Sequence, residues 1–325
     1  MNILMIRANN KGRSNGIDAY CKGLYSIFKD SEEINILEVS NYPVHKFRLV
    51  NDIYKKGIKE IIGGKDVDVV HVNGYTSCTT VQAIWFAKKC GKKIVYTAHW
   101  HPFDTLNRPF FAKIFFNIFL KKLIRRYVDT VVTINNEDTA YFKGFHSNVV
   151  QIPHWNRLHD VSGDTGKKKS DMILFVGKVD SQNKGIDHIY SLPEGKYDIH
   201  CVGSGNMTLR SDITYHRDVT EEEIINLYKQ ASLLVVPSKY EAFSYATLEA
   251  LYLGTPVLIS NSVKIGDYLT GVKGVSFFDF GDYATFANKI QESIGEEVDT
   301  AAIRNIFDLD GIKGMYESVY KNVVD

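Results

Sequence analysis

The sequence has few of the residues that mark special classes of protein. Its 325 residues include only seven prolines and four cysteines, and no two cysteines form a Cys-x-x-Cys pair. The cysteine spacing fits neither a zinc site nor a disulfide framework, so we expect a reducing, cytoplasmic compartment. The low proline content excludes a proline-rich linker protein. The 44% hydrophobic and 24% charged residues are ordinary for a globular chain.

Long hydrophobic runs are also missing. No stretch of about 18 apolar residues is present, so we expect no transmembrane helix. The apolar run at residues 3–6 ends at Arg7, so we expect no signal peptide either. The sequence has no internal repeat and no low-complexity tract.

The net charge is only +1, but the two signs are unevenly distributed. Residues 1–160 hold 23 basic and 14 acidic side chains, a net charge of +9, and residues 161–325 have a net charge of −8. Solvated helix faces account for such an imbalance without any function. Alternatively, the N-terminal half meets an anionic partner, such as a membrane or a phosphorylated acceptor.

Short runs rich in valine and isoleucine alternate with helical spacing in the N-terminal half. The runs are nearly continuous in hydrophobicity, which is typical of parallel strands covered on both faces. Their alternation with helices predicts a doubly wound α/β unit. We expect strands at 3–6, 34–39, 67–72, 93–98 and 130–134, and helices at 17–28, 47–62, 76–90 and 110–127.

The pattern then stops at residues 160–170, which are polar and aperiodic and therefore predict a linker. We expect two α/β domains of Rossmann-like type, 1–160 and 161–309, that face each other across a cleft. The segment 310–325 predicts a final helix whose placement the sequence leaves open, packing back on the N-terminal domain being one option. In the second domain we expect strands at 173–176, 197–202, 233–236 and 257–259, and helices at 221–231 and 246–253.

Ligands of such domains bind at the carboxyl ends of the parallel strands. Gly12 and Gly16 lie between the first strand and helix, where glycines and helix N–H groups can accommodate a phosphate. Their spacing is neither GxGxxG nor a P-loop, so a plain turn remains the alternative. His99 ends a strand and is a candidate ligand-binding residue, or else a structural histidine. No further ligand has the spacing that a zinc site needs.

Two segments of the second domain also follow strands. Lys178 and Lys184 come after the strand at 173–176, and lysines in such a loop are common phosphate partners as well as common surface residues. Glu241 lies in the polar loop after the strand at 233–236, and Ser244 is expected to cap a helix that carries Glu249. The N–H groups of that helix start can bind a phosphate. A structural capping box would explain one glutamate but not the whole loop.

Taken in order along the chain, these segments resemble the motifs of the family 4 retaining glycosyltransferases (glycosyl transferases group 1), which have the GT-B fold. The pair Glu241-x7-Glu249, followed by Gly254-Thr-Pro256, is similar to the motif that defines the family. The resemblance spans essentially the full length. The other similar segments are Phe175-Val-Gly-Lys178 with Lys184-Gly185, Gly16-Ile-Asp-Ala-Tyr20, and Tyr96-Thr-Ala-His99.

The sequence departs from this family pattern at three places. Lys178 stands where the family usually has arginine, which weakens bidentate phosphate binding. Asn15-Gly16 stands for paired glycines, and Ile152-Pro-His-Trp-Asn156 stands where Pro-Asn-Gly is usual. None of these departures removes a catalytic group.

The resemblance implies transfer of a sugar from a nucleoside diphosphate sugar, most commonly a UDP-sugar, to a saccharide or lipid-linked acceptor with retention at the anomeric carbon. It implies a role in bacterial surface polysaccharide synthesis, either lipopolysaccharide O-antigen or capsule. Glu241 would bind sugar hydroxyls and Glu249 ribose hydroxyls. The implied catalytic residues are Glu241, His99 and Lys184, and the implied donor-binding residues are Gly16, Lys178, Lys184, Ser244, Tyr245, Ala246 and Glu249.

The implied chemistry needs neither a metal nor another cofactor, because lysines and a helix N-terminus meet the charge of the leaving diphosphate. Asp66-Val-Asp68 has metal-motif spacing but precedes its strand, and Asp308-Leu-Asp310 is more typical of a helix cap. We expect no nucleic-acid partner. The alternatives are a sugar-nucleotide epimerase and a non-catalytic nucleotide-sugar-binding protein. A nicotinamide dehydrogenase is a third, less supported alternative, because the glycine fingerprint of dinucleotide-binding proteins is missing.

Two segments of the N-terminal half are both basic and apolar, at residues 45–59 and 108–127. Basic amphipathic helices can lie on an anionic membrane surface, which would place the protein at the inner face of the plasma membrane. The alternative is that residues 110–120 pack on the sheet with their basic end in solvent.

Overall fold

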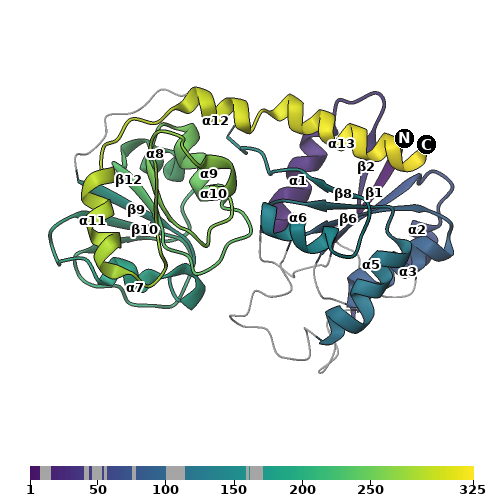
Figure 1. Ribbon diagram of the computed structural model, residues 1–325, viewed down its shortest axis with the longest axis horizontal. Coiled ribbons are helices and arrows are strands. Elements are labelled where there is room, and N and C mark those ends of the chain that lie inside the picture. Colours follow the sequence, from purple (N-terminus) through teal and green to yellow (C-terminus); the bar gives the residue numbers. More distant parts are fainter. Residues whose placement is uncertain are drawn as a thin grey trace. The chain divides into compact units, whose positions relative to one another are not determined.

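The computed structural model describes residues 1–7, 16–39, 44–45, 53–54, 57–74, 78–99, 114–158, 161 and 171–325. The chain forms two compact units. Unit 1 contains Met1–His154 and Asp310–Asp325, and unit 2 contains Trp155–Leu309. Each unit is a parallel sheet with helices against it (Figure 1). The α/β architecture that the valine and isoleucine runs predict is therefore confirmed.

Unit 1 has a sheet of six parallel strands in the order β2-β1-β5-β6-β7-β8. Side chains of these strands point alternately to the two faces of the sheet, and helices cover both faces. Helices α1 and α13 cover one face, and α2, α3 and α5 cover the other (Figure 1). The five expected strands are present. The strands are β1 (Asn2–Arg7), β2 (Asn35–Val39), β5 (Val69–Gly74), β6 (Lys93–Ala98), β7 (Thr130–Thr133) and β8 (Val149–Gln151), and the helices are α1 (Gly16–Phe28), α2 (Ile58–Ile62), α3 (Cys78–Lys89), α5 (Lys121–Tyr127), α6 (Asn136–Lys143) and α13 (Leu309–Val324).

The helix expected at residues 47–62 is confirmed only at its C-terminal end, over Ile58–Ile62. The short strand β4 (Ile53–Tyr54) pairs antiparallel with β3 (Val44–His45), and helix begins only at Ile58. Gly57 precedes that helix with φ 113°, a left-handed backbone that no helix interior adopts. Residues 46–52 and 55–56 lie outside the described part of the chain.

The helix expected at 110–127 is present from residue 114 onward, the earlier residues lying outside the described part. It contains a π turn, η1 (Phe116–Leu120), that continues directly into α5. Phe116, Leu120 and Ile124 are buried against the sheet. Ile118 and Phe119 point away and are exposed. One side of this segment therefore packs on the sheet, as expected if the segment is part of the core. The other side is exposed and does not pack on the sheet.

Unit 2 has a second six-stranded parallel sheet, in the order β11-β10-β9-β12-β13-β14. The four expected strands and both expected helices are present. The edge strands β11 and β14 escaped prediction because many of their side chains are only partly buried, which weakens the hydrophobic signal. The strands are β9 (Met172–Val176), β10 (Asp198–Val202), β11 (Ile213–His216), β12 (Leu233–Val236), β13 (Val257–Ser260) and β14 (Val275–Phe278), and the helices are η2 (Gln182–Lys184), α7 (Ile186–Tyr190), α8 (Glu221–Gln230), α9 (Tyr245–Tyr252), α10 (Gly266–Leu269), α11 (Tyr283–Ser293) and α12 (Thr300–Ile306).

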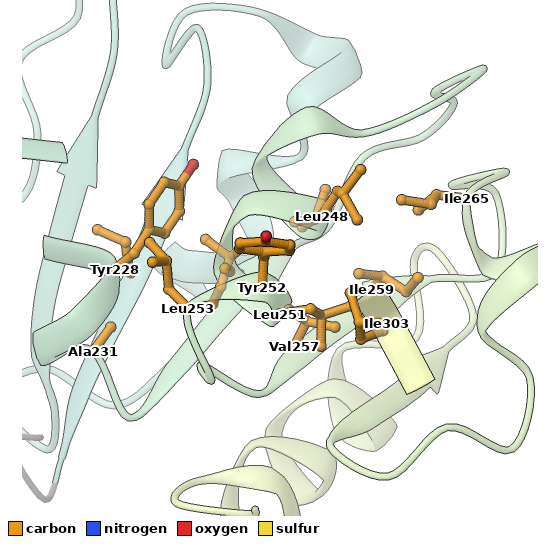
Figure 2. Close-up of a cluster of buried hydrophobic side chains, with 14 of the residues drawn as sticks. Tyr228, Ala231, Leu248, Leu251, Tyr252, Leu253, Val257, Ile259, Ile265 and Ile303 are labelled. Atoms are coloured by element: carbon orange, nitrogen blue, oxygen red, sulfur yellow. The ribbon is translucent and has the colours of Figure 1, made fainter. Parts of the chain in front are cut away.

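Helix α9 is held firmly in the core of unit 2. Leu248 and Leu251 of α9 enter a buried cluster with Tyr228 of α8 and Ile303 of α12 (Figure 2). Gly254 follows the helix with φ 77°, and β13 begins three residues later. Burial of two leucines stabilises the placement of α9 by several kcal/mol, at about 1.5–3 kcal/mol each. The polar residues at its start are therefore carried on a fixed element.

The boundary between the units falls earlier than the sequence predicts. Unit 2 begins at Trp155, not after residue 160, because Leu158 is buried in the same cluster as α9. Except for Val161, the expected linker at 160–170 lies outside the described residues. The final helix, α13, belongs to unit 1, where Tyr316 and Tyr320 are fully buried. Within the described ranges, no helix is long and apolar enough to span a bilayer.

Candidate functional site

The strand order places the expected site residues of unit 2 at a topological switch point. Strands β9 and β12 are neighbours in the centre of the sheet, and the connections after them leave in opposite directions along it. Crevices at such points are the usual ligand sites of parallel sheets. The loop after β9 carries Lys178 and Lys184, and the loop after β12 carries Glu241.

Glu241 and Lys184 form an ion pair between these two loops. Glu241 Oε1 accepts hydrogen bonds from Lys184 Nζ and, at 2.7 Å, from Ser238 Oγ. The Glu241 side chain is only 11% exposed, and its backbone bridges to Val263. Oε2 accepts no hydrogen bond from any residue that the structure describes. The carboxylate is therefore fixed by one oxygen, while the other is available to a ligand hydroxyl.

The two loops are also joined through their backbones. Asn183 Nδ2 donates to Tyr240 O at 2.8 Å, and Lys239 N donates to Asn183 O at 2.8 Å. Gly185 has φ 68°, and a Cβ at this position would lie 1.9 Å from Pro237 O. Only glycine permits this approach, which sets the position of Lys184 against Glu241.

Replacing Gly185 with alanine should destabilise unit 2 and weaken whatever binding depends on Lys184. A left-handed alanine costs about 1–2 kcal/mol, and the overlap with the Pro237 carbonyl adds to that cost. Urea unfolding followed by circular dichroism measures the loss. Gly195→Ala is the matched control, because Gly195 has φ 70° but a Cβ there would meet nothing within 4 Å. Equal losses in the two variants would contradict the close approach.

Glu249 is buried and has partners that the sequence did not reveal. Its side chain is 5% exposed; Oε1 accepts from the Arg157 guanidinium, with Nε at 2.8 Å, and Oε2 accepts from Tyr228 OH at 3.1 Å. Burial raises the pKa of Glu249, and the Arg157 charge only partly offsets that effect. Arg157 also lies 4.8 Å above the Tyr245 ring. The only signal for Arg157 was its place directly after the unusual segment 152–156.

The residues expected to bind a phosphate form the cap and first turn of α9, and their binding role stays a prediction. Ser244 is the N-cap residue, and its Oγ accepts from Thr247 N at 3.3 Å. Tyr245 and Ala246 form the first turn, as the sequence predicts. Ser244 is buried, so the residue that caps α9 is itself held in the interior of unit 2. An anion near this turn would meet the positive end of the helix dipole.

Lys178 is not brought to Glu241. Its half-exposed ammonium pairs with Asp180 at 3.1 Å. The backbone N–H of Asn206 and the Lys178 ammonium lower the pKa of Asp180. A third loop, after β10, also approaches here: a Cβ on Gly203 would lie 2.0 Å from Gly177 O. Sequence reasoning missed this glycine loop.

In unit 1, His99 follows β6 and is held in its neutral form. Its Nε2–H donates to Asn73 Oδ1 at 3.1 Å, and the Tyr20 ring packs edge-on at 4.6 Å between centroids. Burial lowers the pKa of His99 to about 3. The other ring nitrogen, Nδ1, therefore has a lone pair, which can accept from a hydroxyl or face a developing positive charge.

The last helix supports the strands that carry His99 and Asn73. His71 Nδ1 shares a hydrogen bond of 2.8 Å with Tyr320 OH, and His71 Nε2 shares one of 2.7 Å with Thr97 Oγ1. Tyr20 OH donates to Tyr316 OH at 2.9 Å. Burial lowers the pKa of His71 to about 3, so this network is neutral. No local sequence pattern predicts this network, because its members come from four separate elements.

Gly16 is exposed at the first position of α1, and a Cβ on it would meet no described atom within 4 Å. Gly12 and Asn15 lie outside the described residues. Asp68 precedes β5, where its Oδ2 accepts from Asn2 N at 2.8 Å, at the amino ends of the strands. Asp310 lies in the first turn of α13. Over the ranges that the structure covers, no three His, Cys, Asp or Glu side chains gather as metal ligands.

Two family models match the chain. Residues 19–155 match the model described as Glycosyltransferase Family 4, and residues 170–296 match the model described as Glycosyl transferases group 1. A protein of Klebsiella pneumoniae, described as an uncharacterized 41.2 kDa protein in the cps region, is 23% identical over 253 residues. That alignment covers 69% of this chain and 68% of the relative.

Solved structures resemble the chain over its full length. Anabaena HepE in complex with UDP and glucose matches with a TM-score of 0.75 and 12% identity, covering 99% of this chain and 100% of that one. The apo form of the lipopolysaccharide outer core galactosyltransferase WaaB matches with a TM-score of 0.68 and 15% identity, again over 99% and 100%. At these identities the likeness concerns the fold.

Proposed function

Because the chain is a GT-B glycosyltransferase of the group 1 and family 4 type, we propose that it transfers a sugar from a UDP-sugar with retention at the anomeric carbon. The observation that carries this proposal is the Lys184–Glu241 pair at the switch point of unit 2. A cation, a carboxylate with one available oxygen and a helix start are what a sugar diphosphate requires. The bound UDP of HepE supports uracil as the base.

The proposed chemistry follows from the charge that develops on the donor. As the sugar–phosphate bond breaks, negative charge grows on the diphosphate, and Lys184 and the first turn of α9 stabilise it. Glu241 Oε2 accepts from a sugar hydroxyl, and Glu249 meets the ribose. The acceptor attacks the face that the diphosphate leaves, and a phosphate oxygen takes the acceptor proton. His99, through its neutral ring, is assigned to the donor sugar.

For the acceptor we propose a saccharide or lipid-linked saccharide of a bacterial surface polysaccharide. The cps region of the Klebsiella relative and the lipopolysaccharide transferase WaaB support a capsule or lipopolysaccharide pathway. A lipid-linked acceptor would bring the enzyme to the inner face of the plasma membrane. We propose no cofactor, because the protein supplies its own fixed positive groups.

A donor scan tests this proposal. Nucleoside diphosphates and their sugars are added to the full chain, and the melting temperature is measured. A ligand at 100 times its Kd stabilises the fold by about 2.7 kcal/mol, so UDP and one UDP-sugar should raise the melting temperature above all other compounds. If UDP and its sugars fail while another nucleotide stabilises the protein, the UDP assignment is wrong; if none stabilises, donor binding itself fails.

Replacing Lys184 with alanine should weaken donor binding about 10–100-fold, the range expected for losing a hydrogen bond to a charged group. Isothermal titration with UDP measures the change. Lys273→Ala is the matched control, because Lys273 also pairs with a glutamate of unit 2, Glu297, but both side chains are exposed.

The same titration tests the absence of a metal. Adding magnesium or manganese should not restore UDP binding to Lys184→Ala, and a chelator should leave wild-type turnover unchanged. Strict dependence of the wild-type enzyme on a divalent ion would contradict the proposal that lysine and helix charges suffice.

A further inference from the structure

One side of helix α3 combines an exposed tryptophan with two lysines. Trp85, Lys88 and Lys89 stand at i, i+3 and i+4, so they share one helix face. The Trp85 side chain is 43% exposed, and Lys89 Nζ lies 5.0 Å from the centre of its ring. Tyr127 of α5 packs edge-on against Trp85 at 6.4 Å. The exposed aromatic group thus lies where α3 and α5 meet.

The segment η1–α5 continues this surface. While Phe116, Leu120 and Ile124 are buried, Ile118 is 47% and Phe119 57% exposed. Farther along, exposed cations follow at positions 122, 125 and 126. Near its start the segment therefore exposes Ile118 and Phe119 beside Asn117, and near its end its outer side is cationic.

The charge of this surface has a single sign. Residues 78–89 and 116–127 together contain six lysines and arginines and no aspartate or glutamate. Helices α3 and α5 lie side by side in Figure 1 and pack against each other. We call the exposed side chains of α3, η1 and α5 the basic aromatic face. Such a face is complementary to a surface that is anionic outside and apolar beneath.

We propose that the basic aromatic face docks on an anionic lipid membrane. Trp85, Ile118 and Phe119 would enter the boundary between headgroups and acyl chains, where tryptophan is favoured. The lysines and arginines would bind the anionic headgroups. The exposed aliphatic Ile118 favours a lipid over a nucleic acid, which offers no apolar layer. The proposal rests on the proposed function only in that a lipid-linked acceptor gives docking a purpose.

Co-sedimentation of the full chain with vesicles tests the proposal. We expect binding to phosphatidylglycerol/phosphatidylcholine vesicles at low salt, weakening as salt is added, and little binding to phosphatidylcholine alone. Arg125→Glu with Arg126→Glu should lower the partition coefficient at least about thirtyfold. Ile118→Ser with Phe119→Ser should also lower it. Trp85 fluorescence should shift to the blue on binding, and Trp85→Phe should abolish that shift.

Matched controls come from α1, on the other face of the sheet. Tyr25→Ser removes an aromatic side chain that is 49% exposed, and Lys29→Glu reverses an exposed charge near the end of α1. Both should bind vesicles as the wild type does. Equal binding to neutral and anionic vesicles, no binding at all, or control losses as large as those of the face variants would overturn the proposal. Circular dichroism confirms that each variant is folded.

The assay separates this proposal from the proposed function. Hydrolysis of the donor is measured without vesicles on the same variants, and the face variants should keep the wild-type rate. Vesicle binding without any donor turnover would contradict the function and leave the face intact. Donor turnover without vesicle binding would contradict the face alone.

Discussion

Glu241→Gln is expected to lower turnover at least about a hundredfold, the usual scale for losing one positioned polar group. Glutamine has the same shape, and its carbonyl oxygen can still accept from Lys184 and Ser238. Its second terminal atom becomes an amide nitrogen, which cannot accept from a sugar hydroxyl. The change therefore removes the available Oε2 while the rest of the loop is retained. Steady-state kinetics with a saturating donor measure it.

The matched control for this variant is Glu297→Gln. Glu297 also pairs with a lysine, but on the exposed surface of unit 2. It should have wild-type turnover, and circular dichroism should show that both variants are folded, because each change weakens a single ion pair. Wild-type turnover in Glu241→Gln, or an equal decrease in the two variants, would remove Glu241 from the catalytic site.

Arg157→Ala is expected to destabilise unit 2 by about 1–3 kcal/mol at neutral pH. Removing one partner of a buried ion pair costs about 3–5 kcal/mol, and we reduce this figure because Arg157 is 43% exposed and solvent screens its charge. Among the residues that the structure describes, the variant leaves the buried Glu249 carboxylate with only Tyr228 as a partner. Weaker donor binding should accompany the loss, because Glu249 is assigned to the ribose.

This loss should depend on pH in a defined direction. The pKa of Glu249 is raised in the folded state by burial. A raised carboxyl pKa means that folding favours the protonated form, so this contribution to stability falls as the pH rises through the raised pKa. Removing Arg157 raises that pKa further. The variant should therefore be close to the wild type at about pH 3, below the usual glutamate pKa of about 4.3, where glutamate is largely protonated in both states. It should differ most from the wild type at neutral pH.

Urea unfolding at several pH values, with a second substitution, identifies the cause. Adding Glu249→Gln to Arg157→Ala removes the uncompensated charge and should restore much of the stability at neutral pH. Arg304→Ala is the control, because Arg304 also lies above an aromatic ring, that of Tyr252, at 3.7 Å. A pH-independent loss, or no recovery in the double variant, would show that the pairing with Glu249 is not the cause.

The sequence predicted those parts of the fold that depend on local pattern. Central strands such as β6 are buried on both faces, so their composition alone marks them. The edge strands β11 and β14 are half covered and gave a weaker signal. The helix expected over 47–62 begins only at Ile58, because helical periodicity says nothing of the backbone at Gly57, whose φ of 113° interrupts a helix.

In the candidate site, too, the sequence predicted local features but not contacts between distant segments. Ser244 as a helix cap follows from local order, and the structure confirms the cap. That Lys184 meets Glu241 while Lys178 meets Asp180 follows from how two loops approach, which spacing does not encode. Arg157 lies 92 positions from Glu249, so no local rule links them. The sequence predicts both glutamates as site residues, and these roles stay predictions; it did not predict which residues they pair with.

The stereochemistry of the transferred sugar tests the central claim most directly. Once the donor scan has identified the UDP-sugar, its enzymatic turnover is followed by proton NMR. The anomeric coupling constant of the first product is measured early, before any released free sugar mutarotates. An α-linked donor should give an α product together with UDP. A β product would contradict retention. A sugar epimerised at C2 without transfer, or failure to turn over any nucleoside diphosphate sugar, would contradict the assignment as a glycosyltransferase acting on such donors.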